Sequence, residues 1–162
     1  IFYIRTMNIE KRKRLFTSWR YFFFLITKLP MCLIAGVKVK NLNEQESATT
    51  VPYNFINKNP FNSIYFAVQA MAAELSTGIL VFLHFDQSKM SVIVTGLKAK
   101  YIKKAKSKIT FICKDGNKIM DTINLASKSY DSFSCTMTVI GFDSNNDCVS
   151  KFEITWSLKK KK

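Results

Sequence analysis

Apolar residues near the start of the chain recur at three- and four-residue intervals and indicate an amphipathic helix. The repeat covers residues 10–28 and includes Phe16, Trp19 and Phe23. Pro30 is expected to end the helix, because proline disfavours helix in the residue before it. Such a face can rest on a membrane surface or pack onto the domain's own sheet. Packing is favoured, since small domains seldom leave an apolar face unused.

A second, longer apolar segment spans residues 61–85. A loop rich in asparagine, residues 54–62, leads into it, and only Gln69, Glu74 and a few small polar residues interrupt it. Its length would suffice to cross a membrane. A helix that is apolar nearly all round is buried either in lipid or in protein, so the rest of the chain must decide which.

The remaining segments have the alternating pattern of β-strands. Strands are predicted at residues 33–42, 47–53, 90–102, 108–114, 118–127, 133–142 and 149–158. Turns are expected at residues 43–45, 115–117 and 143–147, and the second of them is a tight hairpin signal. Hairpin-linked strands have one face to bury, which a long apolar helix can cover. The pattern therefore favours a soluble domain over a membrane span.

Length and charge refine this picture. A chain of 162 residues is the size of one domain, predicted here over residues 10–158, with a disordered leader at 1–9 and a basic tail at 159–162. The net charge is +14, but clusters at 11–14 and 159–162 hold eight basic residues, and the other 17 against 11 acidic residues leave +6. No nucleic-acid-binding motif accompanies this charge. It predicts weak attraction to anionic surfaces or phosphorylated ligands, and no specific binding of nucleic acid.

Cysteine and histidine usage argues against a metal site. The four cysteines are far apart, none forms a CxxC pair, and His84 is the single histidine. Free thiols, buried or half-buried, are typical of a reducing compartment, so a cytoplasmic location is expected.

The order of elements, with a long buried helix followed by about five antiparallel strands, matches the hotdog fold. Four sequence blocks carry a closer resemblance: LPMCLIAGVKV at 29–39, VPYNFINKNPFNSIYFAVQAMAAELSTG at 51–78, VTGLKAKYIKKAKSKITFIC at 94–113 and FEITWSLK at 152–159. Through them, residues 29–158 resemble a thioesterase-like hotdog family of unknown function, related to the phenylacetate-pathway acyl-CoA thioesterases. The resemblance implies an α+β hotdog domain: a long central helix wrapped by an antiparallel sheet of about five to six strands, with an extra N-terminal helix.

In hotdog thioesterases the chemistry sits where the loop meets the central helix, and the resemblance places Asn62, Ser63 and Ile64 there. Asn62 would replace a histidine. The N–H groups of Ser63 and Ile64 would bind the thioester oxygen and stabilise the charge that develops on it. Asn59 and Tyr65 are expected to contact the substrate. The side chains of Asn59 and Ser63 equally suit helix capping, which needs the same residue types.

One part of the family pattern is missing. Related enzymes place a carboxylate about two turns into this helix, whereas here no Asp or Glu occurs between Asn59 and Ala73. Gln69 lies near the expected depth, but an amide cannot act as a general base near neutral pH. Glu74 is the first acid, eleven residues after Ser63 and ~16 Å further along the helix. It can serve the site only if a second subunit brings it near; otherwise it is a structural acid.

A basic segment has a second implied role. KAKYIKKAKSK, residues 98–108, matches the strand and turn whose basic residues meet the phosphates of coenzyme A in related enzymes. Lys103 and Lys104 are the candidates for that contact, because ammonium groups readily bind phosphate. A solvated hairpin end is the alternative.

Two functions follow from the resemblance. The preferred one is hydrolysis of acyl-CoA, or of a related thioester, by water attack at the N-terminus of the central helix. The alternative is non-catalytic binding of acyl-CoA or an acyl chain, which the missing helix carboxylate favours. Hotdog sites lie between subunits, so a homodimer or a dimer of dimers is expected, with a coenzyme A thioester as ligand and no cofactor. A membrane-associated interaction protein that uses residues 10–28 is a weaker third option.

Overall fold

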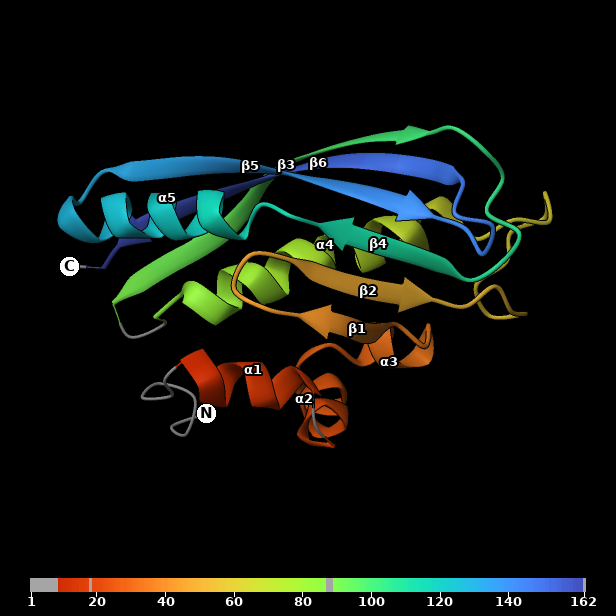
Figure 1. The fold of residues 1–162 in the computed structure, drawn as a ribbon, viewed down its shortest axis with the longest axis horizontal. Coiled ribbons are helices and arrows are strands. Elements are labelled where there is room, and N and C mark those ends of the chain that lie inside the picture. Colours follow the sequence, from red (N-terminus) through yellow and green to blue (C-terminus); the bar gives the residue numbers. More distant parts are fainter. Residues whose placement is uncertain (1–8, 18, 87–88, 162) are drawn as a thin grey trace.

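The computed structural model describes residues 9–17, 19–86 and 89–161 (Figure 1). The helices are α1 Ile9–Thr17, α2 Arg20–Lys28, α3 Pro30–Ile34, α4 Phe66–His84 and α5 Gly116–Lys128. The strands are β1 Lys38–Leu42, β2 Ser47–Val51, β3 Met90–Tyr101, β4 Ile109–Cys113, β5 Ser132–Phe142 and β6 Cys148–Lys160. The predicted leader lies outside the described residues except for Ile9, which begins α1. Part of the predicted basic tail belongs to β6.

The strands form one six-stranded sheet in the order β1-β2-β4-β5-β6-β3, and every neighbouring pair is antiparallel. The sheet curves around α4, and α1 to α3 lie on the side of α4 away from β5 and β6 (Figure 1). The turn predicted at residues 143–147 joins β5 to β6. The predicted architecture, a long helix wrapped by an antiparallel sheet with a helical N-terminal segment, is confirmed.

The central helix α4 is held inside the sheet by both apolar and polar contacts. By length and composition it could cross a membrane, but more than half of it is buried inside the protein. Thr49 Oγ1 of β2 donates a hydrogen bond to the Ala72 carbonyl at 2.7 Å, and Trp156 Nε1 of β6 donates to Thr77 Oγ1 at 2.9 Å. These bonds satisfy polar groups that burial would otherwise penalise. The helix is therefore a core element.

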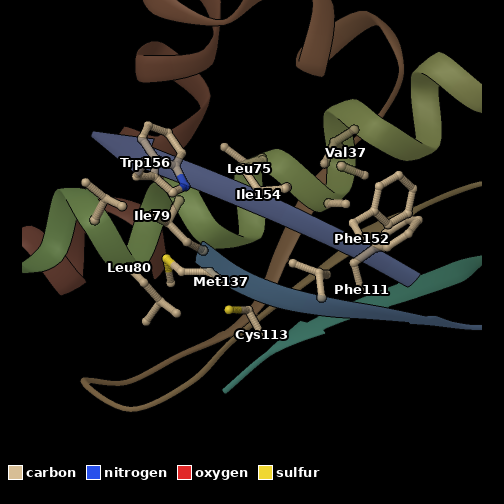
Figure 2. Close-up of a cluster of buried hydrophobic side chains, with 14 of the residues drawn as sticks. Val37, Leu75, Ile79, Leu80, Phe111, Cys113, Met137, Phe152, Ile154 and Trp156 are labelled. Atoms are coloured by element: carbon tan, nitrogen blue, oxygen red, sulfur yellow. The ribbon is translucent and has the colours of Figure 1, made fainter. Parts of the chain in front are cut away.

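The core lies between α4 and the sheet. Alternate side chains of β6 are buried, as their period of two predicts: Phe152, Ile154, Trp156 and Leu158. Figure 2 shows several of them against Ile79 and Leu80 of α4 and Met137 of β5. Burying each such side chain stabilises the fold by roughly 1.5–3 kcal/mol relative to leaving it exposed.

The strand predicted at residues 118–127 is wrong, because this segment forms α5. Its buried residues Ile119, Ile123 and Ala126 are four and three apart, which is the period of a helix rather than of a strand. The segment covers part of the sheet, where α5 packs on β5 and β6.

The hairpin turn predicted at residues 115–117 is also wrong. Gly116 begins α5, and its N–H donates to the Gln45 carbonyl at 2.9 Å. A Cβ at this position would lie 2.1 Å from the Glu44 carbonyl oxygen. The glycine is therefore required by the close approach of α5 to the turn between β1 and β2.

The N-terminal part differs from its prediction in two ways. The helix predicted at residues 10–28 is divided into α1 and α2. Of the strand predicted at residues 33–42, Lys38–Leu42 forms β1, whereas Leu33 and Ile34 belong to α3. Pro30 occupies the first turn of α3, where its missing N–H costs no hydrogen bond. Proline thus both stops one helix and starts the next.

One face of α1 and α2 packs inward, as the preferred alternative predicts: α1 contacts both α4 and strand β1 of the sheet, and α2 contacts α4. The rings of Phe16 and Phe24 lie 5.2 and 6.0 Å from the ring of Phe82, centroid to centroid. Arg12 donates hydrogen bonds to carbonyls at the C-terminus of α4, among them Leu83 O at 3.3 Å. A cation at this end also complements the helix dipole.

Candidate functional site

A cavity of about 330 Å³ lies at the N-terminus of α4. It brings together six of the predicted site residues: Asn59, Ser63, Ile64, Gln69, Lys103 and Lys104. Phe66, Tyr101, Ile102 and Ala105 complete its lining. The loop before α4 and the segment after β3, which are distant in sequence, therefore meet where the resemblance places the chemistry.

Asparagine side chains shape the loop that leads into α4. Asn59 Oδ1 accepts hydrogen bonds from the N–H groups of Phe61 and Ser63, at 3.0 and 3.2 Å, so its side chain stabilises the loop. Asn62 has a φ of 56°, in the left-handed region that asparagine tolerates better than most residues. Asn57, which sequence reasoning missed, is fully buried, and its carbonyl accepts the Tyr65 N–H at 2.7 Å.

The two N–H groups predicted to bind the thioester oxygen already have acceptors within the chain. The Ser63 N–H donates to Asn59 Oδ1, and the Ile64 N–H donates to the Ala105 carbonyl at 2.8 Å. The helix begins two residues after Ile64, with Tyr65 as its N-cap.

The N–H groups at the start of α4 are differently placed. Within the described part of the chain, those of Phe66 and Ala67 have no acceptor. They belong to the first helical turn, whose N–H groups point out of the helix and carry its positive dipole end. Because they are backbone groups, no side-chain motif marked them in the sequence. Phe66 lines the cavity and Ala67 follows it directly, so these two N–H groups are candidates to bind an oxygen atom there.

Two further side chains hold this N-terminus in place. Gln69 is buried; its Nε2 donates to the Ile64 carbonyl and its Oε1 accepts from Ser150 Oγ, both at 3.1 Å. Tyr101, which sequence reasoning missed, donates from its hydroxyl to the Phe66 carbonyl at 3.1 Å. Gln69 thus links the loop, α4 and β6, and its amide is engaged at both ends.

The two predicted lysines differ in their surroundings. Lys103 Nζ lies 2.6 Å from Asp147 and 3.0 Å from Asp143, and hydrogen bonds to these two carboxylates raise the pKa of Lys103. Lys104 Nζ contacts only the Phe61 carbonyl, at 3.4 Å, among the described residues. Lys104 is therefore the more available cation for a phosphate group.

Glu74 lies in a second cavity, of about 230 Å³, that shares no lining residue with the first. Apart from Glu74 its walls are apolar, from α1, α2, α4 and β6 among others, and include Phe16, Phe24, Leu75 and Trp156. Among the residues described, no side chain or N–H donates to the Glu74 carboxyl. Burial raises the pKa of Glu74, because the charged form loses its hydration.

Two neighbours of Glu74 define what this cavity can do. A Cβ at Gly78 would lie 3.4 Å from Glu74 Oε1, so the glycine keeps space beside the carboxyl. This space costs ~1 kcal/mol of helix stability relative to alanine. Burial raises the pKa of Cys32 to about 11, so its thiol stays protonated near neutral pH and is a poor nucleophile. The carboxyl is the group here that can accept a proton.

The two cavities do not meet within one chain. Glu74 is eight residues after Phe66, which is ~12 Å along the helix. The carboxyl and the available N–H groups can act on one substrate only if a second chain contributes one of them.

Comparison with known proteins identifies the family. Residues 17–158 match the family described as a domain of unknown function, DUF4442. The chain belongs to this family. A search of curated proteins gave no significant match to this DUF4442 chain.

Solved structures share the fold of this DUF4442 protein. Protein PA5026 of Pseudomonas aeruginosa, named a probable thioesterase of unknown function, aligns with a TM-score of 0.77 and 18% identity over 96% of this chain and 97% of its own. A protein of unknown function from Chlorobaculum tepidum aligns with a TM-score of 0.74 and 16% identity, covering 94% of each chain. Thioesterase HI1161 of Haemophilus influenzae aligns with a TM-score of 0.64 and 14% identity, over 85% of this chain and 88% of its own. The likeness confirms the predicted α+β fold of hotdog thioesterases.

Proposed function

We propose that this DUF4442 protein hydrolyses acyl thioesters, with coenzyme A thioesters as the substrate class. The observation that carries the proposal is the carboxyl of Glu74, which lies in an apolar cavity and receives no hydrogen bond from any residue that the structure describes. A raised pKa makes a carboxylate a stronger base and is a common property of catalytic acids and bases. The names of the thioesterases that share the fold agree with this chemistry.

Two copies of this chain supply every protein group that the proposed reaction needs. The N–H groups of Phe66 and Ala67 bind the thioester carbonyl oxygen and stabilise its negative charge as water attacks the carbon. Glu74 of a second copy accepts the proton from that water. The C–S bond then breaks, and the same proton passes to the leaving sulfur, which gives a carboxylic acid and a thiol. This assignment moves the oxygen-binding groups from Ser63 and Ile64 to the first turn of α4.

A homodimer, alone or as a dimer of dimers, is part of the proposal. Exposed apolar side chains occur in the loop before α4, at the first cavity and along β3: Phe55, Ile56, Phe61, Tyr65, Phe66, Ile93, Leu97, Tyr101 and Ile102. Among the strands that the structure describes, β3 is also an edge strand, and its partner is β6. An edge with this much apolar surface is suited to pairing with another chain.

Light scattering should therefore give a mass of at least twice 18.7 kDa at micromolar concentration. Ile93→Lys with Leu97→Lys should shift the mass to that of one chain, because like charges on a strand edge oppose pairing. Leu125→Lys, which changes an exposed residue of α5, is the matched control and should keep the parent mass. A parent mass of one chain would contradict both the dimer and the shared site.

Coenzyme A binding should depend more on Lys104 than on Lys103, because Asp143 and Asp147 already engage Lys103. Lys104→Ala should weaken binding roughly two- to fivefold at low salt, as expected for an exposed charge contact. The effect should shrink as ionic strength rises. Calorimetric titration of coenzyme A against both variants checks the order, and equal affinity of Lys104→Ala and the parent at low salt would remove Lys104 from the site.

Binding of acyl-CoA without turnover is the second candidate function. Gln69 favours it, because this amide stands at the position in α4 where related enzymes are expected to have a carboxylate. Hydrogen bonds to the Ile64 carbonyl and from the Ser150 hydroxyl occupy the Gln69 amide. A thiol-release assay on a short, a long and an aromatic acyl-CoA separates the two functions. Release above the uncatalysed rate supports hydrolysis, whereas tight binding of all three without release establishes the binding protein.

A further inference from the structure

The helix α2 is apolar on both faces, and only one of them is covered. Leu25 and Phe24 face inward, whereas an outer set remains exposed: Trp19 (71%), Phe22 (51%), Phe23 (55%), Ile26 (46%), Met31 (62%) and Ile34 (56%). These six residues, from Trp19, which directly precedes α2, to Ile34, the last residue of α3, are called the outer apolar face below.

The aromatic members of this face lie side by side. The Phe23 ring centroid is 5.4 Å from that of Trp19 and 5.9 Å from that of Phe22. Single exposed apolar residues are normal on a protein surface, but a contiguous cluster marks an interaction site. The outer apolar face therefore has the properties of a docking surface.

The charge around this face selects its partner. No Asp or Glu occurs between residues 11 and 43, while the same stretch holds eight Lys and Arg residues. Of these, Arg14 of α1 and Arg20 and Lys28 of α2 are exposed. An interfacial helix inserts Trp and Phe among lipid headgroups while its basic residues contact anionic lipids.

We propose that the outer apolar face docks this protein onto an anionic membrane surface. A second copy fits this face less well, since a two-fold contact would place the basic residues of one chain against those of the other. Figure 1 shows α1 to α3 on the side of α4 away from β5 and β6. Docking would bring lipid near the Glu74 cavity, of which Phe24 and Leu29 form part of the wall. The proposal does not depend on hydrolysis.

Vesicle sedimentation of the full chain tests the proposal. The parent should sediment with phosphatidylcholine vesicles that contain about 30% phosphatidylserine and bind far less to phosphatidylcholine alone. Phe22→Ser with Phe23→Ser should lower the partition coefficient at least about tenfold, because two aromatic anchors are lost. Arg20→Gln with Lys28→Gln should lower it roughly fivefold or more, with a difference that disappears at high salt.

The matched control changes exposed apolar residues elsewhere. Leu125 and Tyr130 are 55% and 56% exposed, at and after α5, and Leu125→Ser with Tyr130→Ser should bind vesicles like the parent. Circular dichroism establishes that every variant is folded. A parent that stays in the supernatant with anionic vesicles, or a serine variant that binds like the parent, overturns the proposal. One further outcome overturns the proposal: the parent does not bind vesicles, and the two Phe→Ser substitutions lower the mass that light scattering measures. The face would then join two copies of the chain.

Discussion

Replacing Glu74 by glutamine should slow thioester hydrolysis by roughly 10²–10⁴-fold, the usual contribution of a general base. Glutamine is nearly isosteric with glutamate, so the helix and the cavity beside Gly78 keep their shape. The amide cannot take a proton from water near neutral pH. Binding of acyl-CoA should be unchanged, which separates proton transfer from substrate contact in steady-state kinetics.

The same variant should be at least as stable as the parent at neutral pH. Burial raises the pKa of Glu74 above its unfolded value, so the folded state holds this proton more tightly than the unfolded state does. The contribution of Glu74 to stability is therefore full below the unfolded pKa and is lost as pH rises through the folded pKa. Above the folded pKa the buried carboxylate is charged, and its lost hydration destabilises the folded state. Glutamine carries no charge and removes this destabilisation, so thermal unfolding should show an equal or higher melting temperature.

The pH dependence of the rate gives a second signature. The base must be ionised, so the acid limb of kcat against pH should have its midpoint above the ordinary carboxyl value and should be absent in Glu74→Gln. Glu153→Gln is the matched control, because Glu153 is exposed and pairs with Lys98 on the surface. A Glu74→Gln protein that melts earlier and turns over normally per folded molecule would make Glu74 a structural acid.

The second large effect should come from removing one backbone N–H. Phe66→Pro should slow turnover by roughly 10²–10³-fold, the cost of losing one donor to a developing oxyanion. Phe66 is the first residue of α4, where proline is tolerated, and Tyr65 has φ −55° and ψ 136°, a conformation that suits the residue before proline. The helix should therefore form.

Phe66→Ala is the control for this prediction, because it removes the ring and keeps the N–H. The ring packs against Tyr65 and Tyr101, with centroids 4.7 and 6.2 Å away, so both variants lose the same contacts. The rate difference between the proline and alanine variants reports the N–H alone. Equal rates would show that another group binds the thioester oxygen.

The fold was largely predictable because its signals are periodic. The buried alternation of β6 and the apolar length of α4 each indicate one structure with little ambiguity. In the segment of α5, the apolar residues Ile119 and Met120 are adjacent, so they do not distinguish the period of a helix from that of a strand. Gly116, which precedes them, stands between an aspartate and an asparagine, a sequence typical of a tight turn. Close approach to the β1–β2 turn explains that glycine, and such a contact is visible only in three dimensions.

The candidate site was predictable in part. The sequence located the segment before α4 and identified Glu74 as the first acid of the helix. It predicted the start of the helix at residue 61, whereas α4 begins at Phe66. Apolar composition continues from Phe61 into α4, so composition alone could not mark the boundary. The surroundings of Glu74 depend on how α1 and α2 pack onto α4, which periodicity does not specify. The cytoplasmic location and the kinship with phenylacetate-pathway enzymes stay predictions.

A hybrid dimer tests most directly the claim that two chains build one site. The Glu74→Gln chain and the Phe66→Pro chain are co-expressed with different tags, and the hybrid dimer is purified. In one of its two sites, the intact Phe66 N–H of the first chain meets the intact Glu74 of the second. The other site has neither group. The hybrid should show about half the turnover of a parent dimer, although each variant alone is nearly inactive. A hybrid as inactive as both variants would place the two groups in one chain and contradict the shared site.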